Sequence, residues 1–280
     1  MKIIGMSLLG RNEKWLEPFL KQLNNLCDEV VVCLNNPDEK TRKIVKQYTK
    51  NYYEDNREWG KLQPIMKEDF LKRVGALKPN WIIWLDADEF FEKRFTRKVA
   101  EEWASKPYDV AYSFWFVQLW DRADMYNLSY SFDDVRFFKF IPEWGLQVKR
   151  TPLHCGNYPY EVAKRRTVSN FYIKHYGLLD KEARKKKWER YQKYDPQGKY
   201  APQWFYDGYI NPKPPIKPFI EADFIKKLSP MKFKFKSIMP SAKPIDPSEP
   251  KRYWRWLNQH GNLIIFNDIK YHQQRINDRS

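Results

Sequence analysis

The feature that most constrains this fold is a run of five large apolar residues at positions 81–85, which ends directly in Asp86-Ala87-Asp88-Glu89. A continuous apolar run of this length is typical of a strand that is buried on both faces, as the strands of parallel sheets are. Such a strand needs helices on both sides of its sheet. The run therefore favours an α/β chain in which strands and helices alternate.

The first 106 residues show this alternation. Residues 2–9 form an apolar run of strand length, and residues 29–34 form another. Between them, apolar residues recur at helical spacing from Leu16 to Leu23, which predicts a helix beginning near Lys14 or Trp15. Pro18 then falls in the first turn of that helix, where proline is tolerated.

Two further helices are predicted from their capping residues. Asp38 is placed to cap a helix running to about residue 50, and Thr96 to cap one running through residue 106. Residues 62–77 predict another helix, with Pro64 near its start. This order of strands and helices is that of a doubly wound α/β sheet.

The pattern is looser after residue 106. Strands are predicted at residues 108–120, 135–141 and 168–174, and Asp180 caps a predicted helix at 181–194. Eleven of the 19 prolines lie between Pro196 and Pro250, which predicts a stretch without regular elements. We therefore expect one domain at residues 1–195 and an irregular, Pro-rich, basic extension at 196–280.

The charge and the cysteines bound the partners and the compartment. The formal net charge of +16 favours an anionic partner, whether nucleic acid, an acidic membrane or a phosphorylated substrate. Three cysteines without paired spacing indicate a reducing compartment. The apolar start of the chain is broken at Arg11, and no stretch reaches the ~18 apolar residues of a membrane span. We expect a soluble, cytoplasmic protein.

The acidic sequence follows the end of a buried strand. In open α/β sheets, ligands bind outside the carboxyl ends of the strands. Asp86 and Asp88, two residues apart, can reach one divalent cation, and that cation can hold a diphosphate and offset the charge of the leaving group. The alternative is that the two acids cap the next turn. The buried strand before them favours the metal site.

Three segments resemble known sequences. Residues 81–90 resemble the metal-binding strand of family 2 glycosyltransferases with the GT-A fold. Residues 10–16 resemble the first turn of that family, and residues 28–32 resemble its second strand. The resemblance covers residues 2–106 well and 107–195 more loosely, and nothing beyond 195 is recognised.

The resemblance implies a GT-A mixed sheet flanked by helices, with a nucleotide-binding half at 1–106 and an acceptor half at 107–195. It implies an inverting transfer of a sugar from a nucleotide-diphosphate sugar, assisted by manganese or magnesium. By analogy, Asp86 faces the nucleotide or shares the metal, and Asp88 binds the metal. The family's acid after the second strand is missing here, so the amide of Asn35 or Asn36 is the expected contact to the base.

Other candidates lie at conspicuous places in the second half. His175 follows a predicted strand and precedes a basic helix, and we expect it to be a third metal or phosphate contact; His154 is its competitor, and packing alone is the alternative for both. Lys187 or Arg190 of the basic helix is placed to reach the diphosphate, unless that helix merely faces solvent. Lys61 and Arg73 are further basic candidates for donor binding.

An inverting transfer needs a general base. The acidic candidates of the second half are Asp121, Asp124, Asp133, Asp134, Glu143 and Glu161. Asp121 and Asp124 follow a predicted strand that ends at Trp120, so they would lie at the rim of the sheet. They are the preferred candidates, although the sequence does not choose among the six.

Three other functions were weighed. A nucleic-acid-binding protein would fit the charge, but the chain shows no recognition motif, and no nucleic acid is expected. A phosphohydrolase using the first aspartate would resemble Asp-x-Asp-x-Thr, whereas Phe90 stands where that threonine would be. A sugar nucleotidyltransferase would need a glycine-rich loop after the first strand, and only Gly10 is present there.

The C-terminal extension is strongly basic. Residues 226–280 hold 12 Lys and Arg against four Asp and Glu, and Trp254 and Trp256 lie among them. This mixture suits the headgroup region of an anionic membrane, and packing of the aromatic residues against the catalytic domain is the alternative. A peripheral membrane contact is therefore one expectation for this protein. The acceptor is left open between a glycan, a lipid-linked molecule and a protein.

Overall fold

The computed structural model describes residues 1–228, except residues 12, 61, 131, 150–152 and 154. These residues belong to a compact unit, Met1–Lys232. The predictions for the basic segment at 226–280 and for the aromatic residues near Trp254 lie almost wholly outside the described residues.

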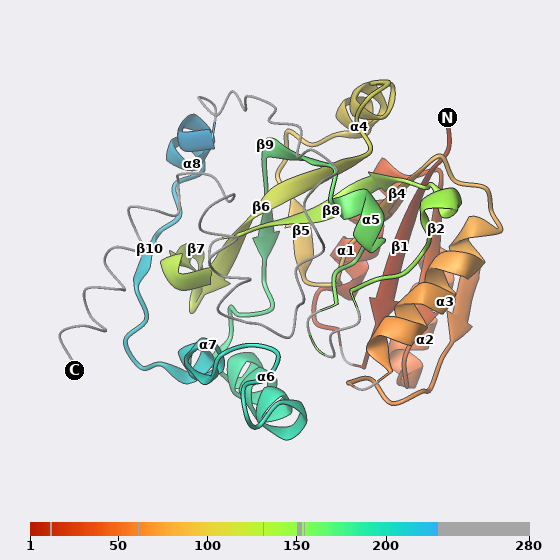
Figure 1. Cartoon of the computed structure of the whole chain (residues 1–280). Helices are drawn as coiled ribbons and strands as arrows, with labels where there is room; N and C mark the ends of the chain where they lie inside the picture. Colours follow the sequence, from red (N-terminus) through yellow and green to blue (C-terminus); the bar gives the residue numbers. More distant parts are fainter. Residues whose placement is uncertain (12, 61, 131, 150–152, 154, 229–280) are drawn as a thin grey trace. The chain divides into compact units, whose positions relative to one another are not determined.

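The described residues form a ten-stranded mixed sheet with helices packed against it (Figure 1). Its strands are β1 Ile3–Leu9, β2 Glu29–Leu34, β3 Asn51–Glu54, β4 Trp81–Trp84, β5 Glu89–Phe91, β6 Ala111–Trp120, β7 Arg122–Asn127, β8 Asp133–Lys139, β9 Arg166–His175 and β10 Ile216–Pro218. The α-helices are α1 Leu16–Leu26, α2 Glu39–Tyr48, α3 Gln63–Gly75, α4 Arg97–Ala104, α5 Tyr160–Ala163, α6 Lys181–Tyr194, α7 Gln203–Asp207 and α8 Glu221–Leu228. The predicted mixed α/β class is confirmed.

The first part of the sheet is parallel. Strands β3, β2, β1 and β4 lie side by side in that order, and Ile4 of β1 is opposite both Glu29 and Ile82. Helices α1, α2 and α4 contribute to the hydrophobic cluster on one face, and α3 covers the other. Because both faces are covered, β4 is buried along its whole length, as its apolar sequence predicts.

Local sequence explains where these helices begin. The side chain of Asp38 accepts a hydrogen bond from the Thr41 amide at 2.7 Å, and that of Thr96 accepts one from the Val99 amide. Both are N-caps, which satisfy amides that have no partner inside the helix.

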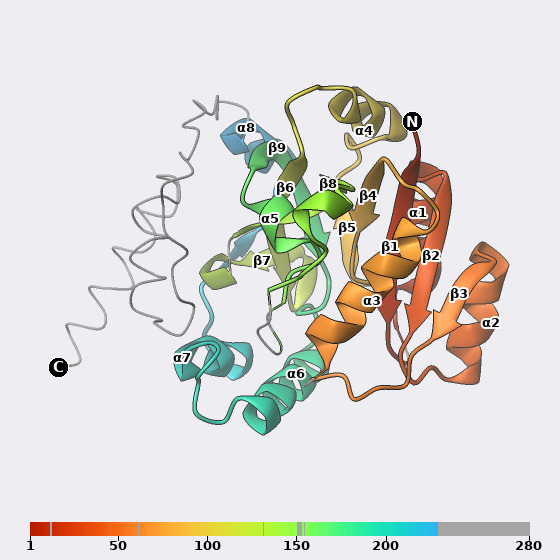
Figure 2. The same cartoon turned by 45° about the vertical axis from the view of Figure 1, so that its right-hand side comes forward.

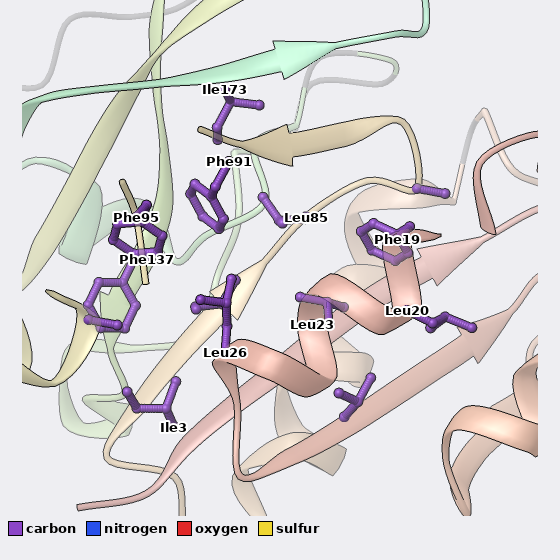
Figure 3. Close-up of a cluster of buried hydrophobic side chains, with 14 of the residues drawn as sticks. Ile3, Phe19, Leu20, Leu23, Leu26, Leu85, Phe91, Phe95, Phe137 and Ile173 are labelled. Carbon is purple, nitrogen blue, oxygen red and sulfur yellow. The ribbon is translucent and has the colours of Figure 1, made fainter. Parts of the chain in front are cut away.

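The inward face of α1 completes one core. Figure 3 shows Phe19, Leu23 and Leu26 gathered with Ile3 and Leu85, and all five side chains are at most 5% exposed. The predicted helical face of α1 is therefore its core-facing side.

The second part of the sheet is mainly antiparallel. Strand β8 pairs antiparallel with β4, β6 pairs antiparallel with β8, and β7 and β10 continue beyond β6. Strand β9 lies parallel to β6, and its end pairs antiparallel with β5, which places His175 opposite Glu89. The strand that follows the acidic sequence is thereby joined to the second half of the chain.

The first part of the predicted irregular extension contains regular elements. Residues 203–228 form α7, a 3₁₀ turn at Gly208–Ile210, β10 and α8. The prediction of irregular structure is wrong here, because the prolines lie at the ends of elements: Pro202 immediately precedes α7, and Pro218 ends an edge strand. The domain boundary at residue 195 stays a prediction.

The short elements β3, β5, β7 and α5 were not predicted. In the part of the chain that the structure describes, no helix combines the length and the apolar character needed to cross a membrane.

Candidate active site

Two adjoining cavities lie at the acidic sequence that follows β4. The larger has a volume of about 400 Å³ and the smaller about 150 Å³. Trp59, Asp86, Lys187 and Arg190 line both, so the cavities share a wall. Figures 1 and 2 show that α6, which carries the two cations, lies on the side of the molecule toward which β1 and β2 point.

The larger cavity collects most of the residues that the sequence singled out. Its lining includes Asn35, Asn36, Asp86, Asp88, His175, Lys187 and Arg190. Residues separated by up to 155 positions in the chain therefore meet at one place, as the topology of the sheet requires.

The acidic sequence is a tight turn closed by its own last residue. The Glu89 amide donates to the Asp86 carbonyl oxygen at 3.1 Å, and the Glu89 carboxylate accepts from the Asp86 amide at 3.2 Å. The same carboxylate accepts two hydrogen bonds from the Arg136 guanidinium of β8, at 2.6 and 2.7 Å. Glu89 is thus the residue that fixes the turn.

The Glu89–Arg136 pair is almost completely buried. Burial and the charge of Asp86 raise the pKa of Glu89 to about 7, while Arg136 opposes this rise. Burial alone would lower the pKa of Arg136, but Glu89 and Asp134 raise it well above its ordinary value. The guanidinium is therefore a fixed positive charge between the turn and β8.

Asp88 and His175 face each other across the β5–β9 pair. The His175 Nε2 atom lies 3.3 Å from Asp88 Oδ2, and the Tyr176 amide donates to the Asp88 carbonyl oxygen at 2.8 Å. Burial alone would raise the pKa of Asp88, but His175 lowers it below its ordinary value. The carboxylate is held ionised.

Gly177 makes this approach possible. A Cβ atom at this position would lie 2.1 Å from Asp88 Oδ2 and 2.7 Å from His175 Nε2. Any side chain at residue 177 would push the two groups apart.

These residues fit a divalent metal ion. Asp88 Oδ1 is buried and has no hydrogen-bond partner among the described residues, which is costly unless a ligand satisfies it. His175 Nδ1 is hydrogen-bonded to the Gln118 side-chain oxygen, so Nε2, which faces Asp88, is the nitrogen that would bind a metal. A carboxylate with an imidazole suits a cation such as Mn²⁺. No group of three His, Cys, Asp or Glu with ligand spacing occurs in the described part, so the ion's other positions would be filled by ligand oxygens or water.

Asp86 is held toward the smaller cavity. Its Oδ1 atom accepts a hydrogen bond from Asn157 Nδ2 at 3.0 Å, and Asn157 is 2% exposed. Asn157 was not predicted from the sequence, because nothing local relates it to a residue 71 positions earlier.

Glu13 is a second residue that the sequence analysis did not assign. It lines the larger cavity, and its carboxylate accepts from the Gly10 amide at 3.1 Å. Burial, together with the nearby charge of Asp88, raises its pKa to about 7. The sequence signal that could have identified Glu13 is its position three residues after Gly10, which directly follows β1.

Two asparagines that directly follow β2, Asn35 and Asn36, line the larger cavity. Asn35 Nδ2 donates to the carbonyl oxygens of Asp55 and Arg57, at 2.5 and 2.9 Å, which commits its amino group to the backbone. Asn36 has φ 48°, a left-handed conformation that asparagine tolerates. Its carbonyl oxygen accepts from the Arg11 guanidinium. These hydrogen bonds hold the loop in place where it lines the larger cavity.

Lys187 and Arg190 supply positive charge. No carboxylate pairs with either of them in the described residues, and Lys187 helps to lower the pKa of Asp88. Two cations that line a cavity with Asp88 and have no carboxylate partner among the described residues are suited to binding a diphosphate.

Other predicted residues lie elsewhere. Among the described residues, Asp121 and Asp124 line neither cavity: Asp121 pairs with Arg184 at 2.6 Å, and Asp124 pairs with Arg122 at 2.5 Å on the surface. Arg73 also lines neither, and its guanidinium lies over the Tyr53 ring. Lys61 and His154 lie outside the described residues.

Of the six candidate bases, all within the described part, only Asp134 lines a cavity. It lies in the smaller one, where it pairs with Arg136 at 2.6 Å.

Comparison with known proteins gives one family match. The sequence model of "Glycosyl transferase family 2" matches residues 6–186, more than half of the chain. No curated protein matches the sequence.

Solved structures give weaker matches. S. aureus TarS is 13% identical with a TM-score of 0.45, and the match covers 75% of this chain and 42% of TarS. The 1–349 fragment of TarS in complex with UDP is 14% identical with a TM-score of 0.36, and the match covers 75% and 70% of the two chains. Glucosyl-3-phosphoglycerate synthase from Mycobacterium tuberculosis, in complex with Mn²⁺ and UDP-glucose, is 10% identical with a TM-score of 0.29, over 41% and 43%. The chain thus spans about two fifths of the length of full TarS.

Proposed function

The chain belongs to glycosyltransferase family 2, and on this premise we propose that it transfers a sugar from a nucleotide-diphosphate donor to an acceptor hydroxyl, with inversion at the anomeric carbon and with the help of a divalent metal ion. The mixed sheet is the GT-A fold that the sequence predicted. Because the chain belongs to this family, we propose sugar transfer in place of phosphate-ester hydrolysis, nucleotidyl transfer or nucleic-acid binding.

One observation supports this function above all others. Three kinds of group line the same 400 Å³ cavity: a carboxylate with a buried oxygen, an imidazole with its second nitrogen already hydrogen-bonded, and two cations. Among the described residues, that oxygen has no hydrogen-bond partner and the two cations have no carboxylate partner. A metal-bound diphosphate needs these groups together: hard ligands for the ion, and cations for the remaining phosphate charge.

Each group has a role in this proposal. Asp88 and His175 hold Mn²⁺ or Mg²⁺, with Gln118 orienting the imidazole, and the bound ion offsets negative charge on the diphosphate. Lys187 and Arg190 bind the phosphates, and Asn35 and Asn36 contact the base. Asp86, held by Asn157, faces the transferred sugar.

A thermal-shift screen tests the donor class. The full chain is heated with UDP, GDP, CDP, ADP and dTDP, each with and without Mn²⁺. One nucleotide is expected to raise the melting temperature by about 5–10 °C at a hundredfold excess over its Kd, and only with metal, since ligand at that excess contributes about 2.7 kcal/mol.

The His175→Ala variant is the companion measurement. It should lose most of the metal-dependent shift, whereas Asp124→Asn, which lines neither cavity, should keep it. A chain that no nucleotide stabilises in the presence of Mn²⁺ or Mg²⁺ would rule out the proposed donor.

We also propose that the reaction takes place in the cytoplasm. The basic extension at residues 196–280 is the part of the chain that would contact a membrane there. Cys27, Cys33 and Cys155 are free thiols, as a reducing compartment would keep them. Cell fractionation at low and high salt tests this, because an electrostatic membrane contact is released by salt. Secretion of the protein with oxidised cysteines would contradict it.

A further inference from the structure

The smaller cavity opens beside the larger one. Trp59, Asp86, Lys187 and Arg190 line both, so a molecule in the smaller cavity lies next to whatever the larger one binds. A chain of hydrogen bonds also joins this cavity to the turn at residues 86–89. Arg136 donates to the carboxylates of Asp134 and Glu89, and the Asp86 amide donates to Glu89. The position suits the second substrate of a two-substrate reaction.

The lining offers hydrogen-bonding groups without an assigned partner. Gln63 is 7% exposed, and its Oε1 atom is buried without a hydrogen-bond partner among the described residues. A buried acceptor of this kind is unfavourable unless a ligand donates to it. A hydroxyl or amide N–H of the ligand is the natural donor.

Aromatic side chains form part of the same wall. Trp59 and Tyr191 both line the cavity, and Tyr191 is 6% exposed. An aromatic ring gives the apolar face of a sugar ring a surface to pack on, while the surrounding polar groups meet its hydroxyls.

Two of the four cations that line this cavity already have hydrogen-bond partners. Arg136 pairs with Glu89 and Asp134, and Lys67 Nζ donates to the carbonyl oxygens of Cys155 and Gly156, at 2.8 and 3.4 Å. The other two cations, Lys187 and Arg190, are shared with the larger cavity. A phosphate group here would therefore find no cation of its own, which favours a neutral ligand.

Asp134 is the acid available to accept a proton. Its carboxylate is held in place by Arg136 Nη1 at 2.6 Å and by the Val135 amide at 3.0 Å, yet its side chain is 23% exposed. A general base must be both positioned and reachable. Its neighbour Asp133 pairs with Arg166 instead, and it lines neither cavity in the described part.

We infer that the smaller cavity binds the acceptor, that this acceptor is a neutral sugar, and that Asp134 is the general base. The inference rests on the proposed function. The acceptor hydroxyl oxygen forms a bond to the anomeric carbon and gives its proton to Asp134. The bond from that carbon to the phosphate oxygen breaks, and its electron pair leaves with the nucleotide diphosphate.

The acceptor class is tested by binding. Saturation-transfer NMR on the full chain uses methyl α- and β-glycosides of the common hexoses as neutral probes, and glycerol 3-phosphate as the phosphate-bearing probe. At least one methyl glycoside should bind, and its signal should fall at least tenfold in Gln63→Leu and in Trp59→Ala. Glycerol 3-phosphate should not compete. Tighter binding of the phosphate probe, or glycoside binding that both variants retain, would overturn the assignment.

The base is tested by turnover with the donor from the thermal-shift screen and the bound glycoside. Asp134→Asn should lower kcat at least about 100-fold, as loss of a general base does, while the affinity for nucleotide with Mn²⁺ stays within about twofold. Asp133→Asn is the matched control and should retain kcat. Asp134→Glu should recover part of the rate if the variant carboxylate reaches the hydroxyl. Wild-type kcat in Asp134→Asn would contradict the role.

The two binding measurements separate the possible failures. If the wild type shows no metal-dependent nucleotide binding, the proposed function is refuted. Intact nucleotide binding without glycoside binding would refute only the acceptor site.

Discussion

The two halves of the molecule are built differently. Residues 1–106 hold parallel strands between amphipathic helices, and their cores are dominated by aliphatic side chains with a few Phe and Trp. The second half, with residues 196–228, is mainly antiparallel, and its outer part is held by stacked aromatic rings and buried polar groups. The larger cavity draws on both, with Asp88 from the first half and His175, Lys187 and Arg190 from the second.

The outer part of the second half shows the contrast best. The rings of Tyr130 and Tyr209 are stacked at 5.2 Å, and those of Tyr191 and Tyr206 at 4.7 Å. Beside them, Asp195 is 2% exposed. Its carboxylate accepts from the Tyr206 hydroxyl at 2.7 Å and from the amides of residues 199–201.

This cluster holds the end of α6, the helix that presents Lys187 and Arg190 to the cavities. If Lys187 and Arg190 bind the phosphates as proposed, that binding depends on residues 196–228, beyond the part that the family match covers. Polar and aromatic contacts, rather than an aliphatic core, position α6.

The largest expected effect is at the joint between the halves. Glu89→Gln breaks the buried pair with Arg136, which leaves the buried guanidinium with Asp134 as its one carboxylate partner among the described residues, and should cost about 3–5 kcal/mol of unfolding free energy. Urea unfolding measures it. Glu54→Gln, which removes the half-exposed partner of Arg42, is the control and should cost less than about 1 kcal/mol. Equal losses of unfolding free energy in the two variants would mean that the buried Glu89–Arg136 pair adds no more stability than the Glu54–Arg42 pair.

The next comparison separates stability from binding. Phe19→Ala in the first half and Tyr206→Ala in the second each remove a fully buried aromatic ring, and each should cost about 3–5 kcal/mol. Only Tyr206→Ala should weaken nucleotide binding with Mn²⁺, since only Tyr206 supports α6. Calorimetric titration of the folded variants with nucleotide and Mn²⁺ decides this. Unchanged affinity in Tyr206→Ala would show that the aromatic cluster does not position α6 for binding.

Asp195 gives the second half a pH dependence. Burial alone would raise its pKa, but the Tyr206 hydroxyl and three amides lower it below the ordinary value of 3.8. A depressed pKa means that the folded state prefers the ionised form, so this stabilisation is present above pH 3.8 and is lost as the pH falls through the folded-state pKa.

Asp195→Asn should therefore cost about 1.5–3 kcal/mol at pH 7, the range for hydrogen bonds to a charged group, and progressively less toward pH 3. Urea unfolding of both proteins across this pH range measures the difference. A difference that does not change with pH would show that the carboxylate charge is irrelevant.

The smallest expected effect concerns the metal site alone. Gly177→Ala places a Cβ atom against Asp88 Oδ2 and should weaken Mn²⁺-dependent nucleotide binding about tenfold, at the lower end of the range for residues that orient metal ligands. At Gly145 an added Cβ has nothing within 4 Å, so Gly145→Ala should change stability through its φ of 86° but not affinity. Equal affinities in all three proteins would place the metal elsewhere.

Sequence reasoning succeeded where the signal is local. Strand β2 has the predicted bounds, and Asp38, Thr96 and Asp180 cap helices as expected. Periodicity and capping depend on neighbouring residues, so they can be recognised without the fold. The short strand β5 escaped because its pairing partner, β9, lies far along the chain.

The site shows the same limit. Asp86, Asp88 and His175 could be singled out because each lies at or just after the end of a strand, and all three line the larger cavity. Gln118 was missed, since only the β6–β9 register places it opposite His175. Asp121 was preferred as the base, but the chain turns sharply there, with φ 60°, and its carboxylate pairs with Arg184. The choice of Asp134 needed the cavity itself.

In the proposed function, Asp88 holds a metal ion that binds the donor diphosphate. Isothermal titration of the full chain, with the nucleotide diphosphate that gives the largest thermal shift, tests it with and without Mn²⁺. Wild type and Asp124→Asn should bind at least about tenfold more tightly with Mn²⁺, and Asp88→Asn should show no dependence on the metal while remaining folded. Metal-dependent binding by Asp88→Asn that equals the wild type would contradict the account.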